Sequence, residues 1–149
     1  MALPIYILNG PNLNFLGVRE PETYGANTLQ DVQDDCEAKA KSLGAEVDFR
    51  QTNHEGTLVD WLQEAHTKAS AVVLNAGAYT HTSVAIADAI RAISTPVIEL
   101  HISNVHAREE FRLHSFLSEA CAGVMVGFGT YGYELAVQAA AHLNNERAD

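Results

Sequence analysis

Short runs of apolar residues, rich in Val and Ile, alternate along this chain with longer segments of helical periodicity. The runs are too short for helices and are typical of strands. They cover residues 5–8, 47–49, 71–74, 97–102 and 124–126. Helices are predicted over residues 29–43, 57–68, 83–93 and 131–143. This alternation predicts an α/β fold whose parallel sheet is covered on both faces. The best match at this length is a flavodoxin-like, doubly wound, five-stranded sheet in a three-layer α/β/α arrangement.

Local signals mark the ends of the predicted helices. Thr28 with Asp31, and Thr57 with Asp60, resemble the residue pairs that cap a helix N-terminus. Gly44 follows the first helix at a place where glycine often ends one. Apolar residues recur along that helix with a helical period and therefore share one face. They are Leu29, Val32, Cys36, Ala40 and Leu43.

Length and charge exclude several classes of protein. The chain has 149 residues, which fits one catalytic domain over residues 1–149. Lys and Arg total 9 against 19 Asp and Glu, so the formal net charge is −10. An acidic surface repels phosphate backbones and anionic membranes, so we expect no nucleic-acid partner and no membrane association. No secretion signal and no apolar run of about 18 residues occurs, which favours a cytoplasmic protein. Cys36 and Cys121 form no disulfide framework and are expected to be buried.

The segments that follow the strands are the candidate site, because doubly wound sheets bind ligands beyond the carboxyl ends of their strands. The first, residues 9–27, is longer than most loops of a compact domain, and such loops are often functional. It contains Arg19 and Tyr24; the alternative is a solvated loop with an ordinary arginine and a packed tyrosine. Another segment offers Asn75 and His81 as hydrogen-bonding groups, although a histidine at a helix start is often merely solvated.

Polar and apolar residues alternate through residues 97–103, where an interior parallel strand should be apolar throughout. Side chains two apart on a strand share a face, so Glu99, His101 and Ser103 are predicted to lie together. A buried carboxylate is costly unless it is paired, and His101 is the natural partner of Glu99. The pair would hold the imidazole in one tautomer and make it a proton donor. The alternative is a structural pair at a subunit contact.

Arginine is scarce, and half of the six arginines fall in predicted strand-end segments. They are Arg19, Arg108 and Arg112, and their placement in an acidic protein suggests an anionic substrate. The alternative is that Arg108 and Arg112 pair with Glu109 and Glu110 on a helix surface, where ion pairs contribute little.

Three familiar ligand motifs are absent or misplaced. Residues 127–132 read G-x-G-x-x-G, but no later strand supplies the acidic residue of a dinucleotide site, so a tight turn with close helix packing is the better interpretation. The seven histidines and two cysteines show no zinc spacing, and no phosphate-binding P-loop occurs. We therefore expect no metal and no bound nucleotide.

The candidate residues suit one type of chemistry if they meet at the sheet edge. A tyrosine is a poor base because its phenol ionises at about pH 10, but a neighbouring guanidinium favours the phenolate. Tyr24 activated by Arg19 could then remove a proton next to a ketone. Asn12, or a water that it holds, could stabilise the enolate, and His101 could protonate a departing hydroxyl. This set predicts cofactor-free elimination of water from a hydroxy ketone.

Five blocks of sequence, in this order, extend that interpretation to a family. They are N-G-P-N-L-N-F-L-G-V-R-E-P-E-T-Y-G over 9–25, N-H-E-G-T-L-V-D-W over 53–61, N-A-G-A-Y-T-H-T-S-V-A-I-A-D over 75–88, E-L-H-I-S-N-V-H-A-R-E-E-F-R over 99–112 and G-F-G-T-Y-G-Y-E-L-A over 127–136. Together they resemble the type II 3-dehydroquinate dehydratases, or type II dehydroquinases. Phe15 and Thr52 depart from the family pattern without touching an assigned role.

The resemblance implies trans elimination of water from 3-dehydroquinate to give 3-dehydroshikimate through an enolate, in the shikimate or quinate pathway of aromatic biosynthesis. It implies no metal and no cofactor. The implied reacting groups are Tyr24 as base, Arg19 as its activator, His101 as acid, Glu99 as the group that orients His101, and Asn12 as holder of a water.

The resemblance also implies a set of substrate contacts and an assembly. The substrate carboxylate would meet Asn75 and the backbone of Ile102 and Ser103. The ring hydroxyls would meet His81, Arg112 and, from a neighbouring subunit, Asp88. The implied assembly is a homododecamer, a tetramer of trimers.

Two rival functions rest on single features. Ser103 with His101 and Glu99 could form a hydrolase triad, but nucleophilic serines of α/β sheets sit on a sharp strand-to-helix turn. A flavin-binding electron carrier is suggested by the fold alone, which is weak evidence for function.

Overall fold

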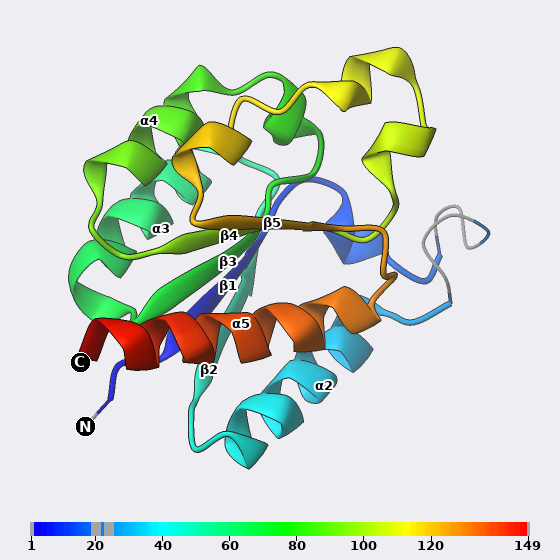
Figure 1. The fold of residues 1–149 in the computed structure, drawn as a ribbon. Coiled ribbons are helices and arrows are strands. Elements are labelled where there is room, and N and C mark those ends of the chain that lie inside the picture. The colour runs from blue at the N-terminus through cyan, green and yellow to red at the C-terminus, as the bar shows by residue number, and fades with distance from the viewer. Residues whose placement is uncertain (1, 19–21, 23–25, 149) are drawn as a thin grey trace.

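The computed structural model describes residues 2–18, 22 and 26–148. Within them, parallel strands form one sheet in the order β2-β1-β3-β4-β5 (Figure 1). The strands are β1 (Ile5–Asn9), β2 (Val47–Gln51), β3 (Ala71–Asn75), β4 (Val97–His101) and β5 (Gly123–Val126). The α-helices are α2 (Leu29–Ser42), α3 (Glu55–Lys68), α4 (Val84–Ala92) and α5 (Tyr131–Ala148). Short 3-10 helices are η1 (Leu13–Phe15), η2 (Gly77–His81), η3 (Val105–Ala107), η4 (Glu110–Leu113) and η5 (Ser118–Ala120). The predicted flavodoxin-like, doubly wound fold is confirmed.

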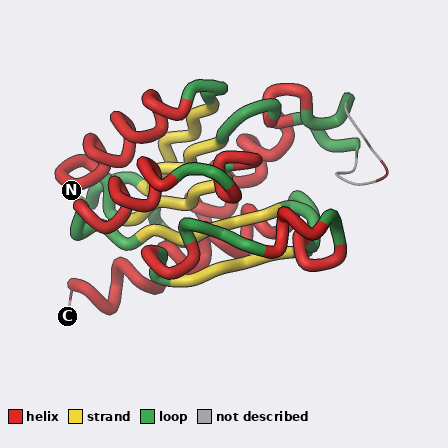
Figure 2. Tube along the Cα trace, turned by 90° about the horizontal axis from the view of Figure 1, so that it is seen from above, coloured by secondary structure: helices red, strands yellow, loops and turns green. Residues whose placement is uncertain are grey.

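Helices cover both faces of the sheet and make three layers (Figures 1 and 2). Alternate residues of a strand point to opposite faces, so β1 contributes to two cores. Ile5 and Ile7 pack with α2 and α5, whereas Tyr6 and Leu8 pack with α3 and α4. Strands β1, β3 and β4 are buried along their whole length, while β2 and β5 are less buried because they form the edges.

One of the two predicted helix caps is correct. Thr28 and Asp31 form a capping box, in which each side chain accepts a hydrogen bond from the other residue's backbone N–H. Gly44 has a φ of 73° just after α2, as expected of a helix stop. Thr57 is not a cap, because α3 begins at Glu55. A carboxylate in the first turn favours this earlier start, since it faces the positive end of the helix dipole.

The sheet ends differ slightly from the prediction. Strand β4 stops at His101, so Ile102 and Ser103 lie in the bend that follows it. Gly10 follows β1 and lies against β3, where its N–H donates to the carbonyl of Asn75 at 2.8 Å. This close approach brings the segments after β1 and β3 together at the carboxyl edge of the sheet.

Other predictions concern features scattered over the fold. Cys36 is fully buried and Cys121 partly buried, and burial raises the pKa of each thiol to about 12.

The G-x-G-x-x-G segment makes a tight turn, with φ of 90° at Gly127 and 63° at Gly129. A Cβ on Gly132 would lie 3.1 Å from Leu100 Cδ1, which confirms the close helix packing. Among the described residues, no helix has the length and apolarity needed to cross a membrane.

Candidate active site

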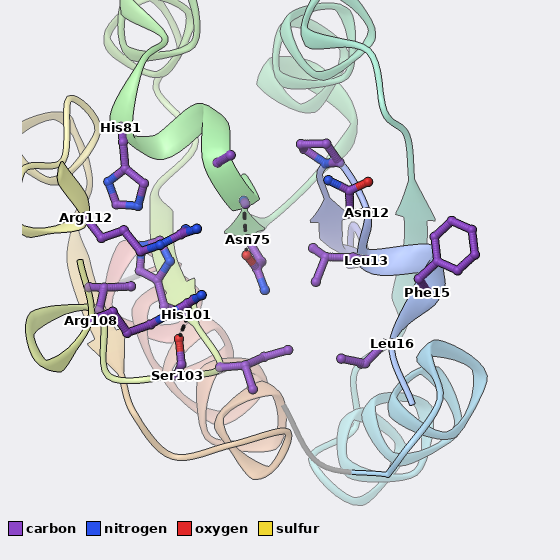
Figure 3. A pocket seen from close by; sticks show the side chains of 15 residues that line it. Asn12, Leu13, Phe15, Leu16, Asn75, His81, His101, Ser103, Arg108 and Arg112 are labelled. Carbon is purple, nitrogen blue, oxygen red and sulfur yellow. Dashed lines mark hydrogen bonds between the residues drawn. The ribbon is translucent and has the colours of Figure 1, made fainter. Parts of the chain in front are cut away.

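A pocket opens at the carboxyl ends of β1, β3 and β4, where the sequence predicted the site (Figure 3). It encloses about 680 Å³ of empty space, including its open mouth. The structure brings most of the predicted site residues to its wall. They are Asn12, Asn75, His81, His101, Ile102, Ser103 and Arg112.

Glu99 lies behind His101 and forms the predicted pair with it. Glu99 Oε2 is 2.6 Å from His101 Nε2, and the side chains are only 3% and 6% exposed. Glu99 has no direct part in the pocket wall, so it acts on a ligand only through the imidazole. With Nε2 held by the carboxylate, Nδ1 is the ring nitrogen through which His101 can exchange a proton with a ligand.

Two serine hydroxyls hold the other oxygen of the Glu99 carboxylate. Ser115 Oγ and Ser118 Oγ donate to Glu99 Oε1 at 3.0 and 2.8 Å. Burial opposes ionisation of this carboxyl, but the hydrogen bonds from His101, Ser118 and Ser115 outweigh it, so the pKa of Glu99 lies below its ordinary value. The pair therefore holds a carboxylate anion hydrogen-bonded to the His101 imidazole.

His81 stands beside His101, with ring centroids 6.2 Å apart and planes 19° from parallel. Its Nδ1 lies 2.8 Å from the carbonyl oxygen of His114, so Nδ1 carries the proton and donates it. Burial, with the nearby charges of His101 and Arg112, lowers the pKa of His81. The neutral ring consequently presents Nε2 as a hydrogen-bond acceptor.

Two arginines supply positive charge to the pocket. Arg112 Nε donates to Glu109 Oε2 at 2.6 Å, while Arg108 Nη1 donates to Ser103 Oγ at 3.2 Å. The Arg108 side chain is only 17% exposed and the Arg112 side chain only 18%. The alternative of ion pairs is thus partly correct, because Arg112 and Arg108 both pair with Glu109, the latter at 3.8 Å, yet both guanidinium groups still line the pocket.

Asn12 has an unusual backbone, with a φ of 69° that no other non-glycine residue in the described part of the chain shares. Asparagine tolerates this left-handed conformation better than most residues. The backbone N–H of Asn12 donates to Asn53 Oδ1 at 3.0 Å, which anchors the segment. Strained backbone positions are common at functional sites, and this one lies in the pocket wall.

The remaining predicted site residues are Arg19, Tyr24 and Asp88. Arg19 and Tyr24 lie outside the described residues. Asp88 is exposed on α4, where its carboxylate is 4.0 Å from Arg91, and it does not line the pocket.

Comparisons with known proteins identify the family. The sequence model of the family Dehydroquinase class II matches residues 3–141. A 3-dehydroquinate dehydratase of Rhizobium johnstonii is 62% identical over 143 residues, which are 96% of this chain and 99% of that protein. The chain belongs to the class II dehydroquinase family.

Two solved class II dehydroquinases share the fold over nearly the whole chain. Type II dehydroquinase from Butyrivibrio crossotus has a TM-score of 0.91 and 43% identity, and the match covers 93% of this chain and 97% of that one. Type II dehydroquinase from Propionibacterium acnes has the same TM-score and identity, with coverage of 95% and 98%.

The family assignment confirms the predicted enzyme class, a type II 3-dehydroquinate dehydratase and therefore a hydro-lyase. It replaces the serine hydrolase and the flavin carrier as interpretations. In this class II dehydroquinase, Ser103 lies in a bend after β4, and its hydroxyl accepts a hydrogen bond from Arg108.

Sequence reasoning missed several residues of the site. No sequence pattern indicates Ser115 and Ser118 as partners of Glu99, because Glu99 lies 16 and 19 residues before them in the chain. The sequence indicated Arg108 only as one of the arginines of an anion site, and the structure places it in the pocket wall. The apolar side of the pocket was not predicted either; it consists of Pro11, Leu13, Phe15, Leu16, Ala78 and Val105.

Proposed function

We propose that this class II dehydroquinase converts 3-dehydroquinate into 3-dehydroshikimate by trans elimination of water through an enolate. The observation that carries the proposal is the buried Glu99–His101 pair, 2.6 Å apart, whose imidazole faces a pocket lined by cations. An anionic hydroxy ketone needs both features: positive groups to bind its carboxylate and a proton donor for its departing hydroxyl.

Tyr24 is the proposed base. As a phenolate favoured by Arg19, it takes the proton from the carbon next to the ketone, and the C–H electron pair becomes the enolate. A water held by Asn12 donates a hydrogen bond to the enolate oxygen and stabilises the charge that develops there.

His101 is the proposed acid. The enolate electrons return to form the new C=C bond, the bond from the β-carbon to its hydroxyl breaks, and that oxygen takes the Nδ1 proton of His101 and leaves as water. Tyr24 is then protonated and His101 neutral, so a proton passes from the phenol to the imidazole through solvent before the next turnover. The ionised Glu99 stabilises the imidazolium that this step requires.

The pocket wall suits the proposed substrate contacts. Asn75 and the backbone of Ile102 and Ser103 bind the substrate carboxylate. His81 accepts from one ring hydroxyl through Nε2, and Arg112 donates to another.

We propose that a neighbouring copy completes the site. Asp88 of the partner subunit would bind a ring hydroxyl, and its exposed position on α4 suits a contact with a second chain. The proposed assembly is a dodecamer of four trimers that needs no metal or cofactor. We place the enzyme in the cytoplasm, in the shikimate or quinate pathway.

An ultraviolet assay tests the function, because the product is a conjugated enone and the substrate is not. The wild-type enzyme should form the enone from 3-dehydroquinate, and Tyr24→Phe should lose at least about 100-fold in kcat, the range for loss of a general base. Tyr131→Phe is the control, since Tyr131 is 57% exposed and does not line the pocket. Failure of the wild-type enzyme to form the enone would refute the function. Near-native turnover by Tyr24→Phe would refute only the assignment of the base.

A further inference from the structure

We infer that Tyr133 is a positioning residue that sets the direction of the Asn75 amide and thereby makes Asn75 a hydrogen-bond donor to the substrate carboxylate. The inference rests on the proposed function, which assigns that carboxylate to Asn75. Tyr133 lies on α5, beneath the sheet, and is fully buried. It therefore cannot touch a ligand and acts only through other side chains.

A chain of buried hydrogen bonds joins Tyr133 to the pocket. Asn75 Nδ2 donates to Tyr133 Oη at 3.0 Å, and the phenol donates in turn to Asn9 Oδ1 at 2.7 Å. Asn9 Nδ2 donates to the backbone carbonyl of Arg50 at 2.9 Å. At the other end, Asn75 Oδ1 accepts from the backbone N–H of Gly77 at 3.2 Å. Asn9 and Asn75 are register partners at the ends of β1 and β3.

The direction of the whole chain follows from its two backbone ends. The Arg50 carbonyl only accepts, so the Asn9 amide must turn its nitrogen toward it and its oxygen toward Tyr133. The phenol has one O–H group, which donates its hydrogen bond to Asn9 Oδ1. Toward Asn75, the phenol oxygen can therefore only accept a hydrogen bond. Asn75 must then turn Nδ2 toward Tyr133 and Oδ1 toward Gly77, whose N–H only donates.

Burial keeps this arrangement in one state. Desolvation raises the pKa of Tyr133 well above its ordinary value, so the phenol remains a donor at every working pH. The other polar atoms are also buried, because Asn9 is 0% and Asn75 4% exposed. A reversed amide would leave unpaired groups in the interior, which costs about 1–3 kcal/mol for each group.

The consequence for the site is a donor of fixed direction. Asn75 Nδ2 carries two N–H groups, and one of them donates its hydrogen bond to Tyr133 Oη. Figure 3 shows the amide nitrogen on the side of Asn75 that faces away from the bond to Gly77. The second proton is left for the pocket wall that Asn75 forms, where it meets an acceptor such as a carboxylate oxygen. The reversed amide would present an oxygen and repel that anion.

Tyr133→Phe tests the inference, because it removes the hydroxyl and keeps the aromatic ring, whose centroid lies 6.4 Å from that of the Phe49 ring. We expect KM for 3-dehydroquinate to rise about tenfold with kcat changed less than about twofold, as the loss of one buried neutral hydrogen bond predicts. Asn9→Ala breaks the same chain from its other end and should raise KM similarly. Tyr131→Phe, on the same helix and exposed, is the matched control and should change neither constant.

A double-mutant cycle separates positioning from general damage to the fold. In an Asn75→Ala background, Tyr133→Phe should have no further effect on KM. An equal rise in that background, or a wild-type KM in a folded Tyr133→Phe or Asn9→Ala enzyme, would overturn the inference.

Amide NMR reports the same point without turnover, so it separates failure of the inference from failure of the proposed function. One Asn75 side-chain amide proton should exchange slowly with solvent in the wild-type protein and at least about tenfold faster in Tyr133→Phe. Equal exchange in the two proteins would overturn the inference even if the enzyme is active.

Discussion

His101 Nε2 and Glu99 Oε2 lie 2.6 Å apart at alternate positions of β4, and both side chains are almost completely buried. They face the side of the sheet on which α3 and α4 pack, where Val97 of the same strand joins the apolar core. Burying an acid and a base at the end of an interior strand costs desolvation free energy, and the hydrogen bond between the two side chains offsets that cost. The arrangement leaves His101 at the pocket and Glu99 one layer behind it.

Glu99→Gln should lower kcat for 3-dehydroquinate by about 100-fold while KM changes less than about threefold. The amide is nearly the same size but carries no charge, so it no longer stabilises the imidazolium that donates the proton. Steady-state kinetics by enone absorbance checks this. Glu37→Gln, an exposed change on α2, is the control. A Glu99→Gln enzyme with wild-type kcat would show that the carboxylate does not assist the acid.

Ser118→Ala should move the acidic limb of the kcat–pH profile to higher pH. The Ser118 hydroxyl donates to Glu99 Oε1, so its loss favours the protonated carboxyl and raises the pKa of Glu99 toward 4.5. The folded pKa is below the unfolded one, so this group stabilises the fold above about pH 4.5 and the contribution is lost as the pH falls through the folded pKa. The variant should therefore also unfold at a higher pH in acid titration. Identical acid limbs in variant and wild type would contradict the assigned role of Ser118.

Ser115→Ala should cost more stability than Ser118→Ala, about 2 kcal/mol against about 1 kcal/mol at pH 7. Besides donating to Glu99, Ser115 Oγ accepts from the backbone N–H groups of Leu117 and Ser118 at 3.0 and 3.1 Å. Its removal leaves two donors without that acceptor, whereas Ser118→Ala removes one donor from a carboxylate that keeps others. Urea unfolding of the two variants gives the comparison, and the reverse order would be inconsistent with this network.

His81 should be a neutral Nδ1–H tautomer at pH 7 and should resist protonation below pH 6.5. Its Nδ1 proton is used by the His114 carbonyl, and burial lowers the pKa of the ring. Below pH 6.5 the unfolded chain takes up the second proton of the His81 ring more readily than the folded chain does. The free energy of unfolding should therefore decrease as the pH falls. Long-range ¹H–¹⁵N correlation spectra identify the tautomer. His81→Asn keeps a donor near the Nδ1 position and should raise KM for 3-dehydroquinate, because it removes the Nε2 acceptor. A proton found on Nε2 of the wild-type ring at pH 7 would refute the predicted tautomer.

Gly10→Ala should destabilise the protein by about 3 kcal/mol or more. A Cβ at this position would lie 2.5 Å from the carbonyl oxygen of Ala76, and a backbone atom cannot move aside without displacing the strand. Gly56→Ala is the control in α3, where a Cβ meets nothing within 4 Å and alanine favours the helix, so it should stabilise by about 0.5–1 kcal/mol. Denaturant unfolding checks both signs. A Gly10→Ala protein of wild-type stability would contradict the close packing of β1 on β3.

Most of the fold was predictable because its signals are local. Apolar runs predicted every strand end to within two residues, and the Thr28–Asp31 pair predicted the start of α2. The error at Thr57 arose because two residues of α3 precede it, and a Ser/Thr pattern cannot tell a cap from a first-turn position. The roles of Tyr24, Arg19 and Asp88 remain predictions.

The sequence by itself determined the alternation of strands and helices and the Glu99–His101 pair, because each depends on spacing over a few residues and on the two-residue repeat of a strand. Only the tertiary structure decided what supports that pair and Asn75. Ser118 reaches Glu99 across 19 residues, and Tyr133 reaches Asn75 across 58 and Asn9 across 124. Hydrogen bonds of such separation leave no periodicity in the chain, since folding alone brings the partners within 3 Å.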